Sequence, residues 1–592
     1  MTMNDLGKMR RSQILFSAGP GAIVDFRTQK GPVSVICLGL DQYPDGPVIH
    51  EARLEKRLAI KGLRSPPAAV ESHPALPMPA LRFPRWMQCP RCDLFQHEAG
   101  WGREAGEPAL HCQQCSAAQS KKVYVIPAPF VTACEEGHLD DFPWVSWVSH
   151  ANDCPAKNLY TLRSEGGAGL AGLILRCHGC GQSRAMEGCF NPDALKPFGP
   201  CPGSRPWLPG APVAICNAAG DGTRKTLQRG ASNMYFPVIA SALDIPPWSD
   251  GLQQKLKRDW DRVLSLSDDE LRDFLRILKL APQVGMSEEE LFREVLVRKR
   301  RLDGSQLEDL RVDEYKQLCA DVALPRDEKA EFEIRVETVP AEIRPWIRRL
   351  VRVVRLREVR ALRAFTRVRS PDPELPGHET LWAALSLEDK DWLPGIEVRG
   401  EGIFVELELN RIASWSERVA DRAKGIDEAW REDWERRHPD VPSPRTVTPK
   451  TLLVHSLAHA IIRELSIECG YSAASLRERL YVHDDACGFL IYTAAPDSDG
   501  TLGGLARQGR ANRFVPVLSN ALSAQRWCAS DPLCIADVHS FSEKATGAAC
   551  HSCLLVSETS CEEFNRLLDR QTLVGSPDDP SRGYFHESTL IA

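Results

Sequence analysis

The sequence predicts a multidomain protein of mixed α/β (α+β) class, with several small cysteine-rich modules and a helical middle region. The 592 residues exceed what one hydrophobic core organises, so we expect about three to five folding units. The 20 cysteines gather in three parts of the chain, several of them in CxxC pairs. Apolar residues follow a helical period in some segments and a strand period in others.

Composition narrows the classes of function and location. Hydrophobic residues make up 43% and charged residues 26% of the chain, an ordinary globular balance. Because the formal net charge is −6, any nucleic-acid binding must use a local basic patch. The first residues lack the apolar core of a signal peptide, and no run of about 18 apolar residues predicts a membrane span. We therefore expect a cytoplasmic protein with no membrane partner, whose cysteines stay reduced.

The clearest cysteine motif is a pair of CxxC knuckles, Cys89 with Cys92 and Cys112 with Cys115. Each knuckle places two thiolates on one tight turn, and two turns complete a tetrahedral zinc site with Zn–S bonds of about 2.3 Å. Because cysteine fills all four positions, none stays open for water. The motif predicts a structural zinc ribbon.

A second set of metal-ligand residues follows the ribbon. It comprises Cys134, His138, His150, Cys154, Cys177, Cys180, Cys201 and Cys216. One partition joins the first four residues in a site with two cysteines and two histidines, and the last four in a four-cysteine site. Interleaved pairing is equally compatible, because spacing does not determine the partition.

A third set lies near the C-terminus, where five thiols compete for four positions. These are Cys528, Cys534, Cys550, Cys553 and Cys561. The last three have the firmest spacing, and either of the first two supplies the fourth ligand. The three sets together predict three or four zinc ions, and zinc at the third set would add folding free energy to a segment with few apolar residues. The remaining cysteines are predicted to be core or incidental: Cys37, Cys189, Cys319, Cys469 and Cys487.

Linkers and periodicity divide the chain into six segments. A proline-rich stretch (65–84) and a second stretch with three prolines (440–450) are typical linkers. The predicted segments are an N-terminal mixed unit (1–80), the four-cysteine zinc ribbon (81–125), the second Cys/His zinc-binding region (126–250), a helical region (251–330), a mixed region (331–450) and a C-terminal unit (451–592).

Local signals predict individual elements within these segments. Two capping boxes, Ser267 with Glu270 and Ser287 with Glu290, indicate helix starts in the helical region. The alternating stretch 403–409 predicts a strand, 451–465 a helix and 488–494 a buried strand. The glycine-rich stretch 17–26 is interpreted as a tight structural turn, because it lacks the lysine of a phosphate-binding loop.

The mixed region contains an arginine-rich segment, residues 344–369, with ten arginines and one glutamate. We predict a helix followed by a short strand, with arginines gathered on one helix face. Arginine binds phosphate well because its planar fork donates two parallel hydrogen bonds. The candidate nucleic-acid-binding residues are Arg348, Arg352, Arg355, Arg360, Arg363 and Arg367. The alternative is a solvated face that pairs with the carboxylates of this acidic chain.

Signals of catalysis are weak. The sequence has no GxxxxGK[ST] and no HExxH motif, which argues against a P-loop nucleotidase and a zincin-type hydrolase. His455 and His459, four residues apart on a predicted helix with Glu464 downstream, are the nearest approach to a catalytic zinc site. We favour core histidines bound to backbone or carboxylate groups. Loop carboxylates at Asp484, Asp485, Asp497 and Asp499 are a weaker candidate for a hard cation.

The C-terminal segment resembles a known family. LLVHSLAHAIIREL, RERLYVHDDACGFLIYTAAPDSDGTLGGL and AACHSCLLVSETSCEEFNRLLDRQTLV (within 452–574) are similar to the MrfA-like zinc-binding (MZB) domain. That domain occurs at the C-terminus of certain superfamily 2 DNA helicases and in a stand-alone protein of bacterial defence islands. The resemblance maps the family's zinc cysteines onto Cys550, Cys553 and Cys561. Because Thr546 replaces a further cysteine of the helicases, the fourth ligand is expected to be Cys534 or Cys528.

Nearly the whole chain resembles the DrmB family of DISARM anti-phage systems. The motifs are SQILFSAGPGAIVDF (12–26), CEEGHLDDFPWVSWV (134–148), QRGASNMYFP (228–237), RLREVRALRAFTRV (355–368) and WCASDPLC (527–534). The resemblance implies a non-catalytic, zinc-binding subunit that partners a DrmA-like helicase and helps it engage foreign DNA. Two alternatives stay open, a zinc-braced scaffold without DNA binding and a metal-dependent hydrolase centred on the two histidines.

Overall fold

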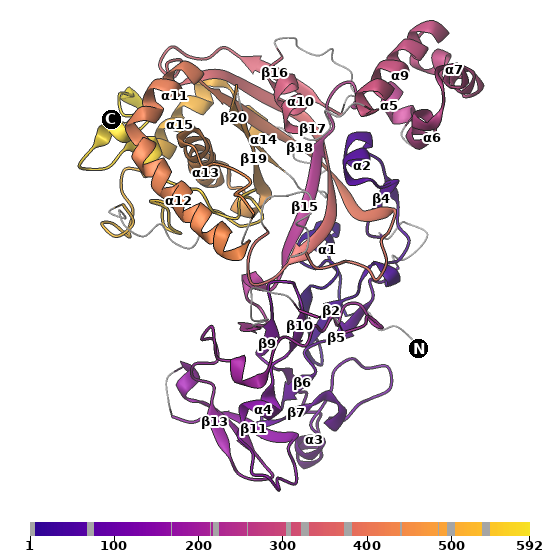
Figure 1. The fold of residues 1–592 in the computed structure, drawn as a ribbon, viewed down its shortest axis with the longest axis vertical. Helices are drawn as coiled ribbons and strands as arrows, with labels where there is room; N and C mark the ends of the chain where they lie inside the picture. The colour runs from indigo at the N-terminus through magenta and orange to yellow at the C-terminus, as the bar shows by residue number, and fades with distance from the viewer. Residues whose placement is uncertain are drawn as a thin grey trace. The chain divides into compact units, whose positions relative to one another are not determined.

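A computed structural model describes residues 6–67, 76–166, 169–213, 215–216, 224–256, 259–303, 310–320, 331–371, 382–438, 441–483, 485–493, 504–535 and 545–591. Helices and strands in several sheets confirm the mixed α+β class (Figure 1). The chain forms two compact units, the first from residues 1–48, 63–240 and 361–396 and the second from 49–62, 241–360 and 397–592. The finer division into six segments stays a prediction. No helix among the described residues is long and apolar enough to cross a membrane.

The first unit consists mainly of short antiparallel strands. Its three sheets have the orders β1-β2-β5, β10-β9-β14 and β13-β12-β11-β7-β6-β8. The strands are β1 (Ile23–Thr28), β2 (Gly31–Cys37), β5 (Ala80–Arg82), β6 (Trp86–Gln88), β7 (Leu94–His97), β8 (Ile126–Pro127), β9 (Phe130–Ala133), β10 (Leu139–Asp141), β11 (Leu159–Ser164), β12 (Leu173–Cys177), β13 (Ser183–Ala185) and β14 (Lys225–Gln228). Its helices are α1 (Arg11–Phe16), α3 (Gln113–Gln119) and α4 (Trp144–Trp147). The largest apolar cluster of this unit gathers aromatic side chains around Trp144 and Trp147.

One buried guanidinium joins segments of the first unit that are distant in sequence. Arg367 donates hydrogen bonds to the carbonyl oxygens of Gly137 (2.9 Å), Met234 (2.6 Å) and Gly21 (2.6 Å). Burial lowers the pKa of Arg367 to about 9. Gly21 has φ +85°, and a Cβ there would collide with the ring of Phe365. The glycine-rich stretch 17–26 is therefore a structural turn, as interpreted from the sequence.

The largest sheet has the order β15-β17-β18-β20-β19, with β16 paired to β17, and most of its residues belong to the second unit. The strands are β15 (Phe236–Leu243), β16 (Glu333–Glu337), β17 (Ile347–Thr366), β18 (Trp392–Leu407), β19 (Leu476–His483) and β20 (Ala486–Thr493), and two short strands, β3 (Val48–Ile49) and β4 (Gly62–Arg64), precede and follow α2 (Ala52–Leu58). Side chains on both sheet faces are buried: Val405 and Phe489 on one, Phe404 and Leu490 on the other. The predicted strands at 403–409 and 488–494 thus correspond to the end of β18 and to β20.

Helices cover both faces of this sheet. α13 (Pro449–Cys469) packs on β19 and β20 (Figure 1) and begins where Thr448 accepts a hydrogen bond from the Thr451 backbone N–H. The predicted helical region contains α5 (Gly251–Leu256), α6 (Trp260–Ser265), α7 (Asp268–Ile277), α8 (Leu280–Val284), α9 (Glu288–Asp303) and α10 (Leu310–Leu318). Both predicted capping boxes are present, at the starts of α7 and α9. The remaining helices are α11 (Leu409–Ser416), α12 (Ala420–Arg437), α14 (Gly504–Gln508), α15 (Ala511–Ala524) and α16 (Gln571–Val574).

The helix predicted in the arginine-rich segment is wrong, because residues 347–366 form the single long strand β17. Neighbouring strands supply the backbone partners, and the β-branched valines favour the extended conformation. Successive side chains of a strand point to opposite faces, so the arginines do not share one face.

Candidate metal centres

Four clusters among the described residues, each with three or four cysteines, are the candidate functional sites. In each, four ligand atoms lie within 4.8 Å of one another. Paired Sγ atoms in these clusters are 3.6 to 3.9 Å apart. A zinc tetrahedron with Zn–S bonds of about 2.3 Å has S–S edges of about 3.8 Å, whereas a disulfide requires about 2.05 Å. The clusters therefore fit zinc ions rather than disulfides.

The first cluster consists of the two predicted knuckles, Cys89 with Cys92 and Cys112 with Cys115. The first knuckle occupies the turn between β6 and β7, closed by a hydrogen bond from the Cys89 N–H to the Leu94 carbonyl (2.8 Å). The second occupies the start of α3. Sγ distances of 3.9 Å join each cysteine of one knuckle to one of the other. This is the arrangement that the sequence predicts for a zinc ribbon.

The second cluster joins Cys134, His138, Cys201 and Cys216. The first two lie on the hairpin between β9 and β10, with His138 Nδ1 3.4 Å from Cys134 Sγ. Cys216 Sγ is 3.6 Å from Cys134 Sγ. The three cysteines form a small buried group of their own, so the segment leading from Gly199 to Cys216 depends strongly on them.

The third cluster joins His150, Cys154, Cys177 and Cys180. His150 Nδ1 lies 3.6 Å from Cys180 Sγ, and its other ring nitrogen lies 3.0 Å from the Tyr160 hydroxyl. That hydroxyl donates to the Lys157 carbonyl, so it accepts from the His150 Nε2–H. In the resulting tautomer the Nδ1 lone pair of His150 points toward the thiols. Second-shell hydrogen bonds fix the tautomer of zinc-binding histidines in the same way.

These groupings correct one partition considered from the sequence. The structure does not join Cys134, His138, His150 and Cys154 in one site. The eight residues pair across the two halves of the set instead, as the alternative allowed, and each cluster contains three cysteines and one histidine. The physical reason is the pairing of strands: the β9–β10 hairpin positions the ligands of one cluster, and the β11–β12 pair positions those of the other. Sequence spacing alone does not show which strands pair.

The fourth cluster lies in the second unit and joins Cys528, Cys534, Cys550 and Cys553. Sγ distances are 3.6 Å from Cys528 to Cys550 and 3.7 Å from Cys534 to Cys553. Both Cys528 and Cys534 belong to it, so the prediction that only one completes the site is wrong. The predicted ligand Cys561 is not part of this cluster, because its sulfur lies against the helix α13 instead.

Each of three clusters contains a thiol that ionises near or below neutral pH. Contact with Cys134 and with His138 lowers the pKa of Cys201 to about 4. Backbone N–H groups lower the pKa of Cys180 to about 6. Burial raises the pKa of Cys550, but hydrogen bonds from Ser530 and from backbone N–H groups outweigh it and bring the value to about 6. Thiolates are the form of cysteine that binds metal.

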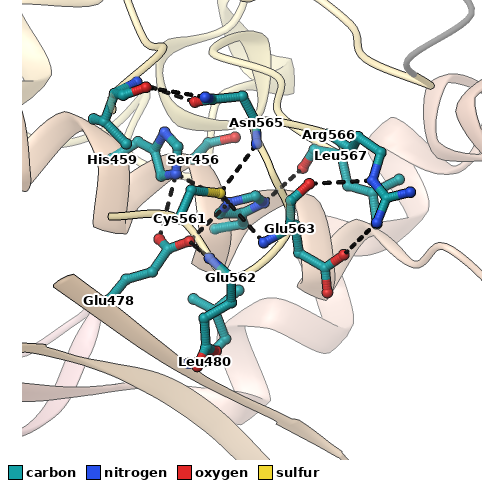
Figure 2. Close-up of polar contacts among 12 residues, drawn as sticks. Ser456, His459, Glu478, Leu480, Cys561, Glu562, Glu563, Asn565, Arg566 and Leu567 are labelled. Atoms are coloured by element: carbon teal, nitrogen blue, oxygen red, sulfur yellow. Dashed lines mark hydrogen bonds and ion pairs between the residues drawn. The ribbon is translucent and has the colours of Figure 1, made fainter. Parts of the chain in front are cut away.

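The histidine pair of α13 is buried and contacts backbone carbonyls and a carboxylate, as favoured from the sequence. His455 and His459 lie with Glu478 of β19 and with Cys561, while Glu464 is absent from this group. Figure 2 shows His459, Glu478 and Cys561 converging. All four residues are buried, which argues against access of a substrate to this group. Spacing along the helix revealed the histidines, but nothing local marked Glu478 or Cys561 as their neighbours. The loop carboxylates Asp484, Asp497 and Asp499 lie outside the described residues.

The arginines predicted to bind nucleic acid mostly bind groups of the protein itself. Arg360 and Arg367 are buried, the former against Glu358. Arg352 pairs with Glu337, and Arg355 with Glu333. The guanidinium of Arg363 covers the ring of Trp382. Arg348, with its side chain 53% exposed, still lies 3.6 Å from Glu406. Pairing with carboxylates, the alternative considered from the sequence, describes most of this segment, and buried members cannot contact phosphate.

A basic group missed by the sequence analysis lies around the start of α15. Arg507, Arg510 and Arg513 are close in the chain, and their side chains form no ion pair or hydrogen bond with any other residue that the structure describes. A Cβ placed at Gly509 would lie 2.8 Å from the Cγ of Arg352, so this turn lies close to β17. Three cations at a helix N-terminus are unfavourable because they oppose the helix dipole. Their clustering before a predicted helix was the sequence signal for this basic group.

Comparisons with known proteins agree with these sites. Residues 10–236 match the model of a domain of unknown function, DUF8724, and residues 457–554 match the MrfA Zn-binding domain. A DISARM protein DrmB of Bacillus paralicheniformis is 31% identical over 548 residues, which cover 86% of this chain and 91% of that protein. The zinc-binding family match and the four clusters agree with the predicted three or four zinc ions.

Proposed function

Because the chain belongs to the family of the DISARM protein DrmB, we propose that it is a non-catalytic, zinc-binding subunit of a DISARM-type anti-phage restriction system. In this proposal it partners a superfamily 2 helicase and helps that helicase to engage foreign DNA. The observation that carries the proposal is that each sulfur-rich cluster offers four protein ligands. A zinc ion with four protein ligands has no position for water, so it braces the fold and does not hydrolyse.

The helicase contact is proposed for the loop that carries two ligands of the fourth cluster. Trp527 and Leu533 are 72% and 85% exposed, although they flank Cys528 and Cys534. Large apolar side chains held rigidly at the surface are typical anchors of protein interfaces. Zinc would hold this loop in shape before the partner arrives, which lowers the entropic cost of binding.

We expect the double variant Trp527→Ser/Leu533→Ser to lose the helicase in co-purification from cells that express both proteins. Loss of one buried anchor typically weakens an interface by about 2 kcal/mol or more, so retention should fall by at least ~10-fold. DNA-stimulated ATPase activity of the mixture should fall with it. Zinc content should not change, because no ligand is altered.

Ile467→Ser is the matched control, since Ile467 is 77% exposed on α13 and lies away from the zinc loop in sequence. Normal recovery of the helicase with the double variant would contradict the proposed contact surface. Failure of the wild-type protein to retain the helicase would contradict the partnership itself.

The DNA contact is proposed for Arg507, Arg510 and Arg513. These side chains have no counter-charge among the described residues, and phosphate groups of DNA would provide one. The N-terminus of the 14-residue helix α15 adds backbone N–H groups that can bind phosphate. The negative charge of the whole chain does not oppose this, because contacts with DNA are local and screened over about 10 Å.

Replacing the three arginines with glutamine should weaken DNA binding at least ~10-fold at 0.1 M salt. If each binds one phosphate, the slope of log affinity against log salt should fall by about 2.7. Fluorescence anisotropy with duplex and single-stranded DNA measures both quantities. The control removes equal charge from Arg276, Arg300 and Arg436, which are exposed and form only surface ion pairs.

These two experiments also separate the subunit from a pure scaffold. A scaffold would lose nothing when the arginines are replaced and would bind no DNA, alone or with the helicase. Unchanged affinity and salt slope in the arginine variant would contradict the proposed DNA surface.

A further inference from the structure

We propose that His455, His459, Glu478 and Cys561 bind an additional zinc ion, at a closed site separate from the four sulfur-rich clusters. The ligands come from three segments of the second unit: helix α13, strand β19 and the loop after the fourth cluster. Two of them, His455 and Cys561, lie outside the residues that match the MrfA Zn-binding domain.

The four ligand atoms have the spacing of a small coordination sphere. His455 Nε2 lies 3.0 Å from His459 Nε2, 3.1 Å from Glu478 Oε1 and 3.2 Å from Cys561 Sγ. His459 Nε2 lies 3.4 Å from Glu478 Oε2. Nitrogen ligands at about 2.0 Å from zinc are about 3.3 Å apart in a tetrahedron, close to these values.

Hydrogen bonds on the far side of each imidazole determine its tautomer. His455 Nδ1 lies 3.2 Å from the Leu567 carbonyl oxygen, and His459 Nδ1 lies 3.0 Å from the Leu554 carbonyl oxygen. A carbonyl oxygen only accepts, so each Nδ1 must carry the proton and donate. Neutral imidazoles then turn two Nε2 lone pairs toward each other, an arrangement that needs a cation between them. Zinc-binding histidines have this second-shell pattern.

The thiol is prepared for metal binding in the same way as in the fourth cluster. Cys561 Sγ accepts hydrogen bonds from the backbone N–H groups of Glu563 (3.3 Å) and Asn565 (3.2 Å) (Figure 2). Cys528 Sγ accepts a corresponding bond from the Ser530 N–H, two residues later, at 3.2 Å. Donors on one side of the sulfur stabilise the thiolate and leave its other side for the ion.

The carboxylate has one oxygen that the described residues leave without a hydrogen bond. Glu478 Oε1 accepts from the Glu562 N–H at 3.1 Å. Glu478 Oε2 is fully buried and finds no hydrogen-bond donor among the residues that the structure describes. A buried carboxylate oxygen without a donor is costly, and a bound cation removes that cost.

Charge balance also favours the ion. The side chains of both histidines and of the glutamate are 0% exposed. One thiolate and one carboxylate neutralise the two charges of zinc, so the filled site is neutral, as deep burial requires. Without metal, the pair of histidines would need an extra proton next to the carboxylate to hold the same positions. The filled site would fasten the loop from Cys553 to Leu567 onto α13 and β19.

The test compares zinc content by elemental analysis and native mass spectrometry in the wild-type full-length protein and in Cys561→Ser. The variant should contain one equivalent less zinc than the wild type, and wild type should reach five ions, one for each ligand group. The difference does not depend on complete filling of the other clusters. Equal zinc content in the two proteins would overturn the proposal, as would four ions in fully loaded wild type.

Glu478→Gln provides a second variant, because it preserves the shape and the contact with the Glu562 N–H but weakens a metal ligand. It should also lose one equivalent, whereas a purely hydrogen-bonded cluster would leave the zinc content unchanged. The control is Cys487→Ser, a buried cysteine of the same unit that belongs to no ligand group. If both site variants fail to fold, the native mass of wild type decides alone between four and five ions.

Discussion

The double variant Cys201→Ser/Cys216→Ser should expose the segment from Gly199 to Cys216 to protease while the rest of the protein stays folded. Structural zinc contributes on the order of 10 kcal/mol in small modules, and this segment contains no helix or strand among its described residues. Trp207, now fully buried, should become a chymotrypsin site. Loss of only ~3 kcal/mol makes cleavage ~100-fold faster. Zinc content should fall by one equivalent.

Cys189→Ala is the control, because Cys189 is buried nearby and belongs to none of the ligand groups. It should retain all zinc and resist cleavage after Trp207. Loss of one zinc equivalent from the double variant without faster cleavage would show that the ion does not brace this segment.

Arg479→Met should cost about 3–5 kcal/mol of folding free energy, the usual cost of removing one partner of a buried ion pair. Arg479 donates two hydrogen bonds of 2.6 Å to Glu314, and both side chains are 0% exposed. The pair connects β19 to α10. In the variant the Glu314 carboxylate stays buried, with the Tyr481 hydroxyl and the Leu243 N–H as its remaining donors. Denaturant unfolding measures the loss.

The cost of Arg479→Met should also depend on pH. Burial alone would raise the pKa of Glu314, but Arg479 holds it below its usual value. The ion pair therefore stabilises the wild type above the ordinary glutamate pKa of about 4.3, and this stability is lost as pH falls through the lower folded value. In the variant the pKa rises, so the penalty is full near neutral pH and shrinks as Glu314 takes a proton.

Two further variants check this interpretation. Arg479→Met/Glu314→Gln should recover most of the lost stability, because no unpaired charge remains buried. Arg399→Met should cost less than about 1 kcal/mol, since the Arg399 side chain is 47% exposed and water screens its ion pairs with Glu331 and Glu397. Equal losses for Arg399→Met and Arg479→Met would contradict the role of burial.

Local signals predicted much of the fold and the members of the sulfur-rich clusters. The capping boxes at Ser267 and Ser287, the apolar helix α13 and the buried strand β20 all follow from short-range patterns. Cysteines and histidines in knuckle spacing are equally local, because each pair sits on one turn. Such features need no knowledge of distant contacts.

Features that depend on tertiary contacts could not be predicted from local sequence patterns. β17 contains a helix-compatible arginine spacing, but its neighbours in the sheet decide its conformation. The pairing of the knuckles depends on the hairpins that carry them. The side chains around Cys561 come from segments about a hundred residues away in sequence. Glu478 has no sequence signal beyond an acidic residue on a buried strand face.

The ligand order along the chain has a consequence for assembly. His150, Cys154, Cys177 and Cys180 all lie between His138 and Cys201, so one metal loop is nested inside another. During synthesis the inner set is complete before Cys216 leaves the ribosome. Closing the inner loop shortens the outer one and lowers the entropy lost when its ends meet. The order of the ligands along the chain therefore favours filling of the inner site before the outer one.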